Sequence, residues 1–201
     1  MLLVGLTGGL ASGKTFVGHA FRDLGCHLIE ADELGHQVLL PGAEAYDAAV
    51  RAFGHEILDQ NGYIDRHKLG ERVFGKPEEL EMLSSFVHPA VTARQEGMIT
   101  EIRKADPGAI VVVEAAILVE TGSYKKFDRL ILVVCTQEQQ MERAMKRGKY
   151  TREEAQARFS RQLPLDEKLR VANYVIDTSG TKENTIEQVR AVYNSLRSLS
   201  A

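Results

Sequence analysis

Residues 8–15 read GGLASGKT, and this stretch decides the fold of the chain. It fits the phosphate-binding pattern G-x-x-x-x-G-K-[ST], whose glycines let backbone N–H groups curl around phosphate oxygens. A short apolar run at residues 2–7 precedes it, and a helical pattern of apolar residues follows at residues 13–24. This order of strand, loop and helix favours a phosphate-binding loop over a glycine-rich turn of an unrelated fold.

The loop has residue types that suit ATP with Mg²⁺. A lysine at position 14 reaches the β- and γ-phosphate oxygens, and the hydroxyl of Thr15 ligates Mg²⁺. Lys14 is therefore also predicted to be catalytic. The residues predicted to bind ATP in this region are Gly8, Gly9, Ala11, Ser12, Gly13, Lys14, Thr15 and Phe16.

The rest of the chain alternates apolar runs with helical patterns. The apolar runs at residues 109–114 and 129–134 predict two further buried strands. Short strands are also expected at residues 27–30 and 174–177, and an amphipathic helix at about 183–199. Together with residues 2–7 they predict an α/β fold, a doubly wound parallel sheet of about five strands.

Between the second and third predicted strands lies a long segment, residues 31–108. A crossover between parallel strands needs about a dozen residues, so this segment is an insertion. It reads as helices at about 32–40, 43–53, 66–74 and 77–104. We expect a core of residues 1–31 and 109–201 and a helical substrate-binding insertion at 32–108, although helices that merely decorate the core remain an alternative.

Residues 143–161 hold seven basic side chains and are divided by Gly148, which is typical of two short helices forming a lid. A lid carries arginines onto the transferred phosphoryl group and excludes water. We assign Arg143 to catalysis and ATP binding, and Arg147, one helical turn later, to ATP binding. A solvated helix face is the alternative for the charges of this segment, Arg143 and Arg147 included.

Polar residues of the insertion are candidates for the acceptor site. Asp32 follows the second predicted strand, where a carboxylate can accept the proton of an attacking hydroxyl and hold hydrated Mg²⁺ through water. A helix N-cap is the alternative role for Asp32. Substrate contacts are also assigned to His36, His88 and Arg94, with structural roles left open. Near the end of the third strand, either Glu114 or Glu120 is a candidate for contact with Mg²⁺ through water.

Composition excludes some classes of function. The formal net charge of −3 gives no basic field for nucleic acid or anionic membrane, and no segment reaches the ~20 apolar residues of a membrane span. Cys26 and Cys135 are expected to be buried free thiols without a disulfide or a metal. These features predict a soluble, cytoplasmic protein, and they leave its oligomeric state open.

The chain resembles the dephospho-CoA kinase family almost from end to end. The motifs that carry the resemblance are the opening residues 5–9, Glu30-Ala31-Asp32, His36, His88-Pro89, Ile117-Leu118 with Glu120, Gln140-x-x-Arg143 and Arg158-x-x-x-Gln162. The resemblance implies that ATP and dephospho-CoA are the substrates, that the 3′-hydroxyl of dephospho-CoA is phosphorylated in the last step of coenzyme A synthesis, and that Asp32 is the base.

Two other functions fit part of the same pattern. A nucleoside or nucleotide kinase would use the same loop with a different acceptor. A non-catalytic, ATP-gated switch module would also carry such a loop, but Asp32 and a basic lid argue for catalysis.

Overall fold

The computed structural model describes residues 1–146, 151–160 and 162–200. The chain forms two compact units. The first, which we call the core unit, comprises Met1–Glu30 and Ile102–Ala201, and the second, the insertion unit, comprises Ala31–Glu101.

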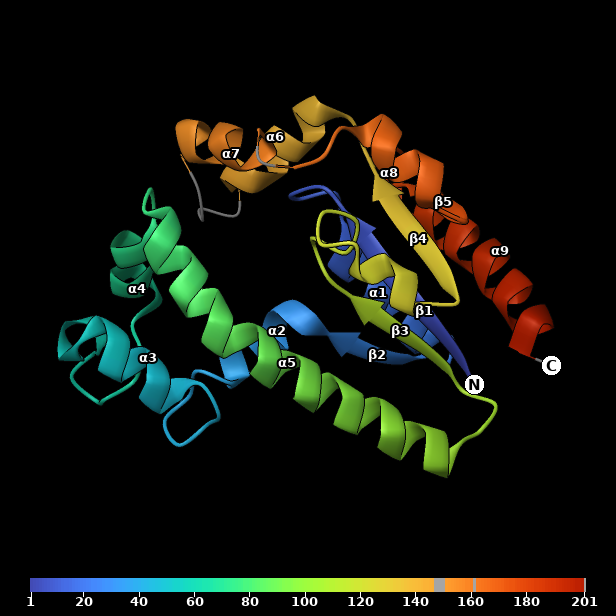
Figure 1. Ribbon diagram of the computed structural model, residues 1–201. Coiled ribbons are helices and arrows are strands. Elements are labelled where there is room, and N and C mark those ends of the chain that lie inside the picture. The colour runs from blue at the N-terminus through green and yellow to red at the C-terminus, as the bar shows by residue number, and fades with distance from the viewer. Residues whose placement is uncertain (147–150, 161, 201) are drawn as a thin grey trace. The chain divides into compact units, whose positions relative to one another are not determined.

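The core unit is built on a five-stranded sheet in the order β2-β3-β1-β4-β5 (Figure 1). All neighbouring strands are parallel. The strands are β1 (Leu2–Gly8), β2 (His27–Glu30), β3 (Ile110–Glu114), β4 (Arg129–Val134) and β5 (Tyr174–Asp177). The predicted fold class, a doubly wound parallel sheet of five strands, is confirmed.

Side chains alternate between the two faces of the sheet, and the alternation decides what each face packs against. On β4, Ile131 and Val133 belong to the hydrophobic cluster that also contains Val17 of α1 (Lys14–Asp23) and Val189 of α9 (Lys182–Ser200). The intervening residue Leu132 points to the opposite face, which α8 (Leu165–Val171) covers at β4. Helices therefore pack on both faces, so the central strands β1, β3 and β4 are mostly apolar.

The remaining elements of the core unit lie in the connections that follow β3 and β4. They are η2 (Ser123–Lys126), α6 (Gln137–Lys146) and α7 (Arg152–Phe159). The predicted lid, residues 143–161, thus contains the end of α6 and all of α7. Arg147, assigned above to ATP binding, lies outside the described residues.

The insertion unit is helical. Its elements are α2 (Ala31–Gln37), α3 (Tyr46–Phe53), η1 (His55–Ile57), α4 (Arg66–Val73) and most of α5 (Pro77–Ala105). Phe53, Ile57 and Leu69 are buried in its own hydrophobic cluster. Asp65 caps α4 by accepting hydrogen bonds from the N–H groups of His67 and Lys68, which satisfies two donors that a helix start leaves unpaired.

The two cysteines differ in burial. Cys26 is buried, as expected, and burial raises the pKa of its thiol to about 12. Cys135 is only half-buried, so the prediction of burial was wrong for it. It directly follows β4, where the chain leaves the sheet. Burial is the main cause that raises the pKa of the Cys135 thiol. Both thiols are free.

Within the described ranges, none of the helices combines the length and the apolar character needed to span a membrane.

Candidate functional site

The phosphate-binding loop connects β1 to α1 through a backbone that few residues adopt. Ala11 has φ 54° and Gly13 has φ 94°, both in the left-handed region. The N–H of Ser12 closes the turn by donating to the carbonyl of Gly9 at 3.2 Å. The turn delivers the chain to the start of α1, where N–H groups without helical partners favour anions.

Gly8 is required because the loop passes very close to β4. A Cβ atom on Gly8 would lie 2.3 Å from the carbonyl oxygen of Val133, which is part of a backbone that cannot yield easily. The close approach of β1 to β4 therefore explains a glycine at this position of the pattern.

Lys14 is nearly buried, with 9 % of its surface exposed, and its side chain turns back over the loop. Its Nζ donates to the carbonyl oxygens of Gly8 and Gly9, each at 3.1 Å. The ammonium group is thus held directly over the loop that the sequence predicts to bind phosphates.

Thr15 and Glu114 place two oxygen ligands together at the start of α1 and the end of β3. The Thr15 hydroxyl donates to Oε1 of Glu114 at 3.0 Å, and Glu114 is 6 % exposed. Hydroxyl and carboxylate oxygens are the ligands that Mg²⁺ prefers, usually together with phosphate oxygens of the substrate. These two residues therefore fit a magnesium ion brought by a nucleotide. The described part of the chain holds no group of three or more His, Cys, Asp or Glu placed to bind a metal.

Arg143 is connected to the phosphate-binding loop through Thr178. Its guanidinium donates to the Thr178 hydroxyl at 3.0 Å and to the Thr178 carbonyl at 2.7 Å. The Thr178 hydroxyl in turn donates to the carbonyl of Ser12 at 2.7 Å. The sequence did not single out Thr178, because a lone threonine after a strand carries no motif.

Two further side chains that the sequence singled out, Phe16 and Glu120, have partners within the core unit. The ring of Phe16 lies 5.9 Å from the Nζ of Lys182. Glu120 pairs with Lys168 of α8 at 2.5 Å. Of the two glutamates that the sequence left as alternatives, Glu114 is therefore the one beside Thr15.

Four predicted site residues lie in the insertion unit. Asp32 is exposed in the first turn of α2, and none of the hydrogen bonds among the described residues uses its carboxylate as a helix cap. His36 is one helical turn further along α2 and is also exposed. His88 is exposed within α5, which runs without a break through Pro89.

Arg94, the fourth, is engaged within the insertion unit. Its guanidinium donates to both carboxylate oxygens of Glu44, at 3.1 and 2.7 Å, and to Gln37 at 3.4 Å. The pKa of the Glu44 carboxyl is lowered, first by a backbone hydrogen bond and then by Arg94. A substrate phosphate would have to compete with this carboxylate.

Comparison with known proteins identifies relatives along the whole chain. A family model described as dephospho-CoA kinase matches residues 2–184. The dephospho-CoA kinase of Aquifex aeolicus is 41% identical over 196 residues, covering 98% of each chain. That of Geobacillus kaustophilus is 42% identical over 195 residues, covering 95% of this chain and 94% of its own. The structure of a dephospho-CoA kinase from Campylobacter jejuni matches with a TM-score of 0.73 and 26% identity, covering 99% of this chain and 98% of the other.

Proposed function

Because the chain belongs to the dephospho-CoA kinase family, we propose that it transfers the γ-phosphoryl group of ATP to the 3′-hydroxyl of dephospho-CoA. The bond from the γ-phosphorus to its bridging oxygen breaks, and a bond to the 3′-oxygen forms. The products are ADP, coenzyme A and the proton of the hydroxyl. This reaction is the last step of coenzyme A synthesis.

The observation that carries the proposal is the phosphate-binding loop inside a chain that matches the family model over residues 2–184. Lys14 supplies a positive charge over the loop, and N–H groups at the start of α1 supply hydrogen bonds. In phosphoryl transfer, positioning and electrostatic stabilisation of this kind account for most of the catalysis.

Asp32 is proposed to accept the proton of the 3′-hydroxyl. It follows Glu30, the last residue of β2, by two positions, and Glu30 is level with Glu114 in the sheet. Among the described residues, the exposed carboxylate of Asp32 accepts no hydrogen bond that would cap α2. This supports a role for Asp32 other than the helix N-cap.

Mg²⁺, when bound with ATP, would neutralise charge on the β- and γ-phosphates. Thr15 and Glu114 are the residues proposed to hold it, with Asp32 contributing through water. Arg143 is proposed to stabilise charge on the transferred group and to contact ATP. The guanidinium is suited to this role because its planar donors can grip two phosphate oxygens at once.

The insertion unit is proposed to bind the acceptor, with His36, His88 and Arg94 as contacts. Action in the cytoplasm remains a prediction, which the two free thiols support.

The test is to measure ADP release with dephospho-CoA, AMP, CMP, UMP and adenosine as acceptors. We expect dephospho-CoA to be used at least roughly a hundredfold better by kcat/KM, since the others lack most of its contacts. Equal use of a nucleoside monophosphate would favour a nucleotide kinase. Turnover that does not depend on any acceptor would contradict both kinases.

A further inference from the structure

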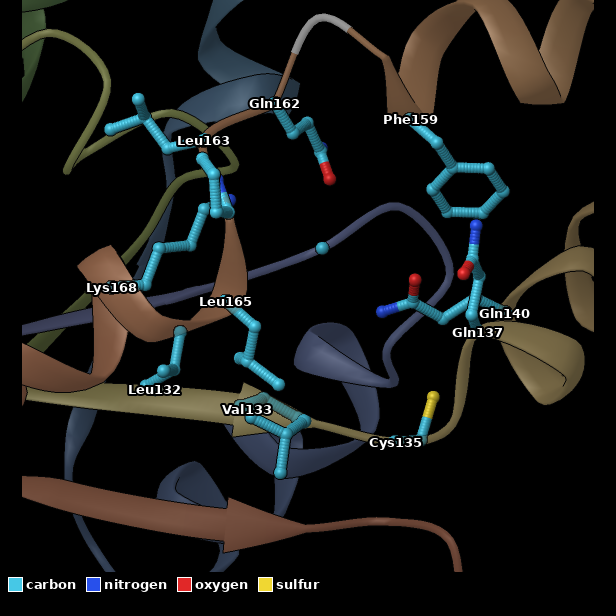
Figure 2. Close-up of a pocket in the computed structure, with 13 residues that line it drawn as sticks. Leu132, Val133, Cys135, Gln137, Gln140, Phe159, Gln162, Leu163, Leu165 and Lys168 are labelled. Carbon is cyan, nitrogen blue, oxygen red and sulfur yellow. The ribbon is translucent and has the colours of Figure 1, made fainter.

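A pocket of about 340 Å³ lies beside the phosphate-binding loop, entirely within the core unit (Figure 2). This volume is within the range of small-molecule sites. Gly9 lines it on the side of the loop, and Leu132 and Val133 line it on the side of the sheet. None of the residues assigned above to the acceptor contributes to it.

Helix α6 presents residues to two adjoining parts of the site. Gln139 and Arg143 are four positions apart, and they bind the backbone of Ser179 and Thr178 respectively. Gln137 and Gln140 are three positions apart, and both line the pocket. Gln140 is also three positions from Arg143, so the pocket adjoins the side of α6 on which Arg143 lies.

The polar lining of the pocket is mainly carboxamide. Figure 2 shows the ring of Phe159 beside the amides of Gln137 and Gln140, with the Gln162 carboxamide turned toward the same space. The side-chain oxygen Oε1 of Gln162 accepts a hydrogen bond from the backbone N–H of Leu10 at 3.3 Å. The amide of Gln140 is packed so closely over Gly9 that a Cβ there would lie 2.5 Å from its nitrogen.

Among the described residues that line the pocket, Lys168 is the one that carries a charge, and its charge is matched. Lys168 is 3 % exposed and lies 2.5 Å from Oε1 of Glu120. A buried ammonium paired with a carboxylate adds little net charge to the pocket. The lining thus suits a neutral group that offers both donors and acceptors, rather than a phosphate.

We propose that this pocket binds a purine base, and that the base is the adenine of the acceptor. A glutamine amide can pair with the N6 and N7 atoms of adenine through two hydrogen bonds. The Phe159 ring and the aliphatic side chains of Leu163 and Leu165 provide apolar surface for the flat faces of the base.

The identification as the acceptor's adenine rests on the proposed function. In dephospho-CoA, the reacting 3′-hydroxyl is on the ribose that carries the adenine. A base in a pocket that borders Gly9 would therefore place this ribose next to the phosphate-binding loop. The adenine of ATP offers the same hydrogen-bonding groups. In this proposal it binds instead on the part of α6 that carries Arg143.

The experiment compares bases on the acceptor and on the donor. Acceptor discrimination is the ratio of kcat/KM for dephospho-CoA to that for its deaminated analogue, in which hypoxanthine replaces adenine. Donor discrimination is the same ratio for ATP and ITP. The variants are Gln137→Met, Gln140→Met and the double variant, in which an unbranched side chain of similar length lacks the amide.

We expect the wild type to prefer the adenine acceptor by roughly ten- to a hundredfold, the value of one pair of hydrogen bonds to a base. One or both substitutions should reduce this preference by tenfold or more and leave donor discrimination unchanged. Calorimetric titration of dephospho-CoA without ATP should show the same loss of affinity, independently of turnover. Glu138→Gln, an exposed neighbour on α6, is the matched control and should retain both ratios.

Three results would overturn the proposal. The first two are equal use of both acceptors by the wild type and unchanged acceptor discrimination in a folded double variant. The third is a variant that loses donor discrimination and keeps acceptor discrimination, which would assign the pocket to the adenine of ATP. These outcomes are distinct from failure of the proposed function, in which the wild type would show no turnover dependent on dephospho-CoA. The melting temperature reports whether each variant folds. Phe159→Leu removes the aromatic ring proposed to contact the base, and it should also reduce acceptor discrimination.

Discussion

The hydroxyl of Thr15 donates to Oε1 of Glu114 across 3.0 Å, which joins the first turn of α1 to the last residue of β3. Glu120, only six residues later, instead pairs with Lys168. Two glutamates that are equivalent candidates in the sequence thus have different partners, and they should respond differently to the same substitution.

Glu114→Gln should raise the Mg²⁺ concentration needed for half-maximal turnover by roughly 10–100-fold, the usual effect of changing a group that supports a metal site. Glu120→Gln should instead lower stability by about 3–5 kcal/mol, because it leaves the buried Lys168 charge unpaired. The measurements are Mg²⁺ titrations of turnover and denaturant unfolding for both variants. If Glu114→Gln has a normal Mg²⁺ requirement, Glu114 does not support the ion.

Lys14→Met should lower kcat by roughly 10²–10³, the effect of losing one charged donor to the transition state. The methionine keeps the buried stem, so the melting temperature should change little. Lys126→Met, an exposed position on η2, serves as the control and should keep normal kcat. Near-normal turnover of Lys14→Met would show that the loop does not act on the phosphates as proposed.

Asp32→Asn should bind ATP normally but lose phosphoryl transfer by at least ~10², the lower range for a general base. The asparagine keeps the shape of the side chain and cannot accept the proton as a carboxylate does. Asp47→Asn is a matched control, because Asp47 is also an exposed aspartate in the first turn of a helix of the insertion unit. Equal kcat for the two variants would remove Asp32 from the mechanism.

Arg143→Lys should reduce kcat by roughly tenfold or more, because an ammonium cannot grip two phosphate oxygens. It should also lower stability by about 1 kcal/mol, since at least one hydrogen bond to Thr178 is lost. Thr178→Val separates the two effects: it removes the hydroxyl and keeps the guanidinium. Stopped-flow or steady-state rates should stay near normal in Thr178→Val. An equal loss of kcat in both variants would mean that Arg143 acts only through Thr178.

Stability should fall as the pH rises above about 9. The folded protein holds the pKa of Cys26 at about 12, whereas the exposed thiol of the unfolded chain ionises near its ordinary value of 9.0. Between these values the unfolded state has lost a proton that the folded state keeps, so rising pH favours unfolding. Denaturant unfolding at pH 8, 9.5 and 10.5 should show a steeper loss for wild type than for Cys26→Ala, in which the other titrating groups are unchanged. Parallel pH profiles would contradict this.

The sheet was predictable because its central strands β1, β3 and β4 are largely buried and the shorter edge strands alternate with helical patterns. The bounds of β4, Arg129–Val134, and of β5, Tyr174–Asp177, are those expected from the apolar runs. The phosphate-binding loop was equally clear, since its glycines, Lys14 and Thr15 each have a stereochemical or chemical reason. Helix α8, Leu165–Val171, was not predicted, because a seven-residue segment with four charges gives no clear apolar periodicity.

The pocket beside Gly9 could not be predicted as a unit. Gln140 and Gln162 were noted only as parts of short motifs, and neutral amides are compatible with any exposed helix. A buried lysine such as Lys168 is unexpected from sequence, since its burial depends on Glu120, which is 48 residues away along the chain. Contacts of this kind depend on tertiary packing, which local patterns do not encode.

The left-handed conformation of Ala11 has a consequence for the tolerance of the loop to mutation. A residue with a Cβ costs about 1–2 kcal/mol in this region of φ and ψ, and glycine avoids that cost. Asparagine offsets part of the cost by a local side-chain hydrogen bond. In a saturation library at position 11 selected for thermal stability alone, glycine and asparagine should therefore be enriched over alanine. If selection for turnover retained alanine instead, a rigid loop would favour turnover even though the strained backbone of Ala11 lowers stability.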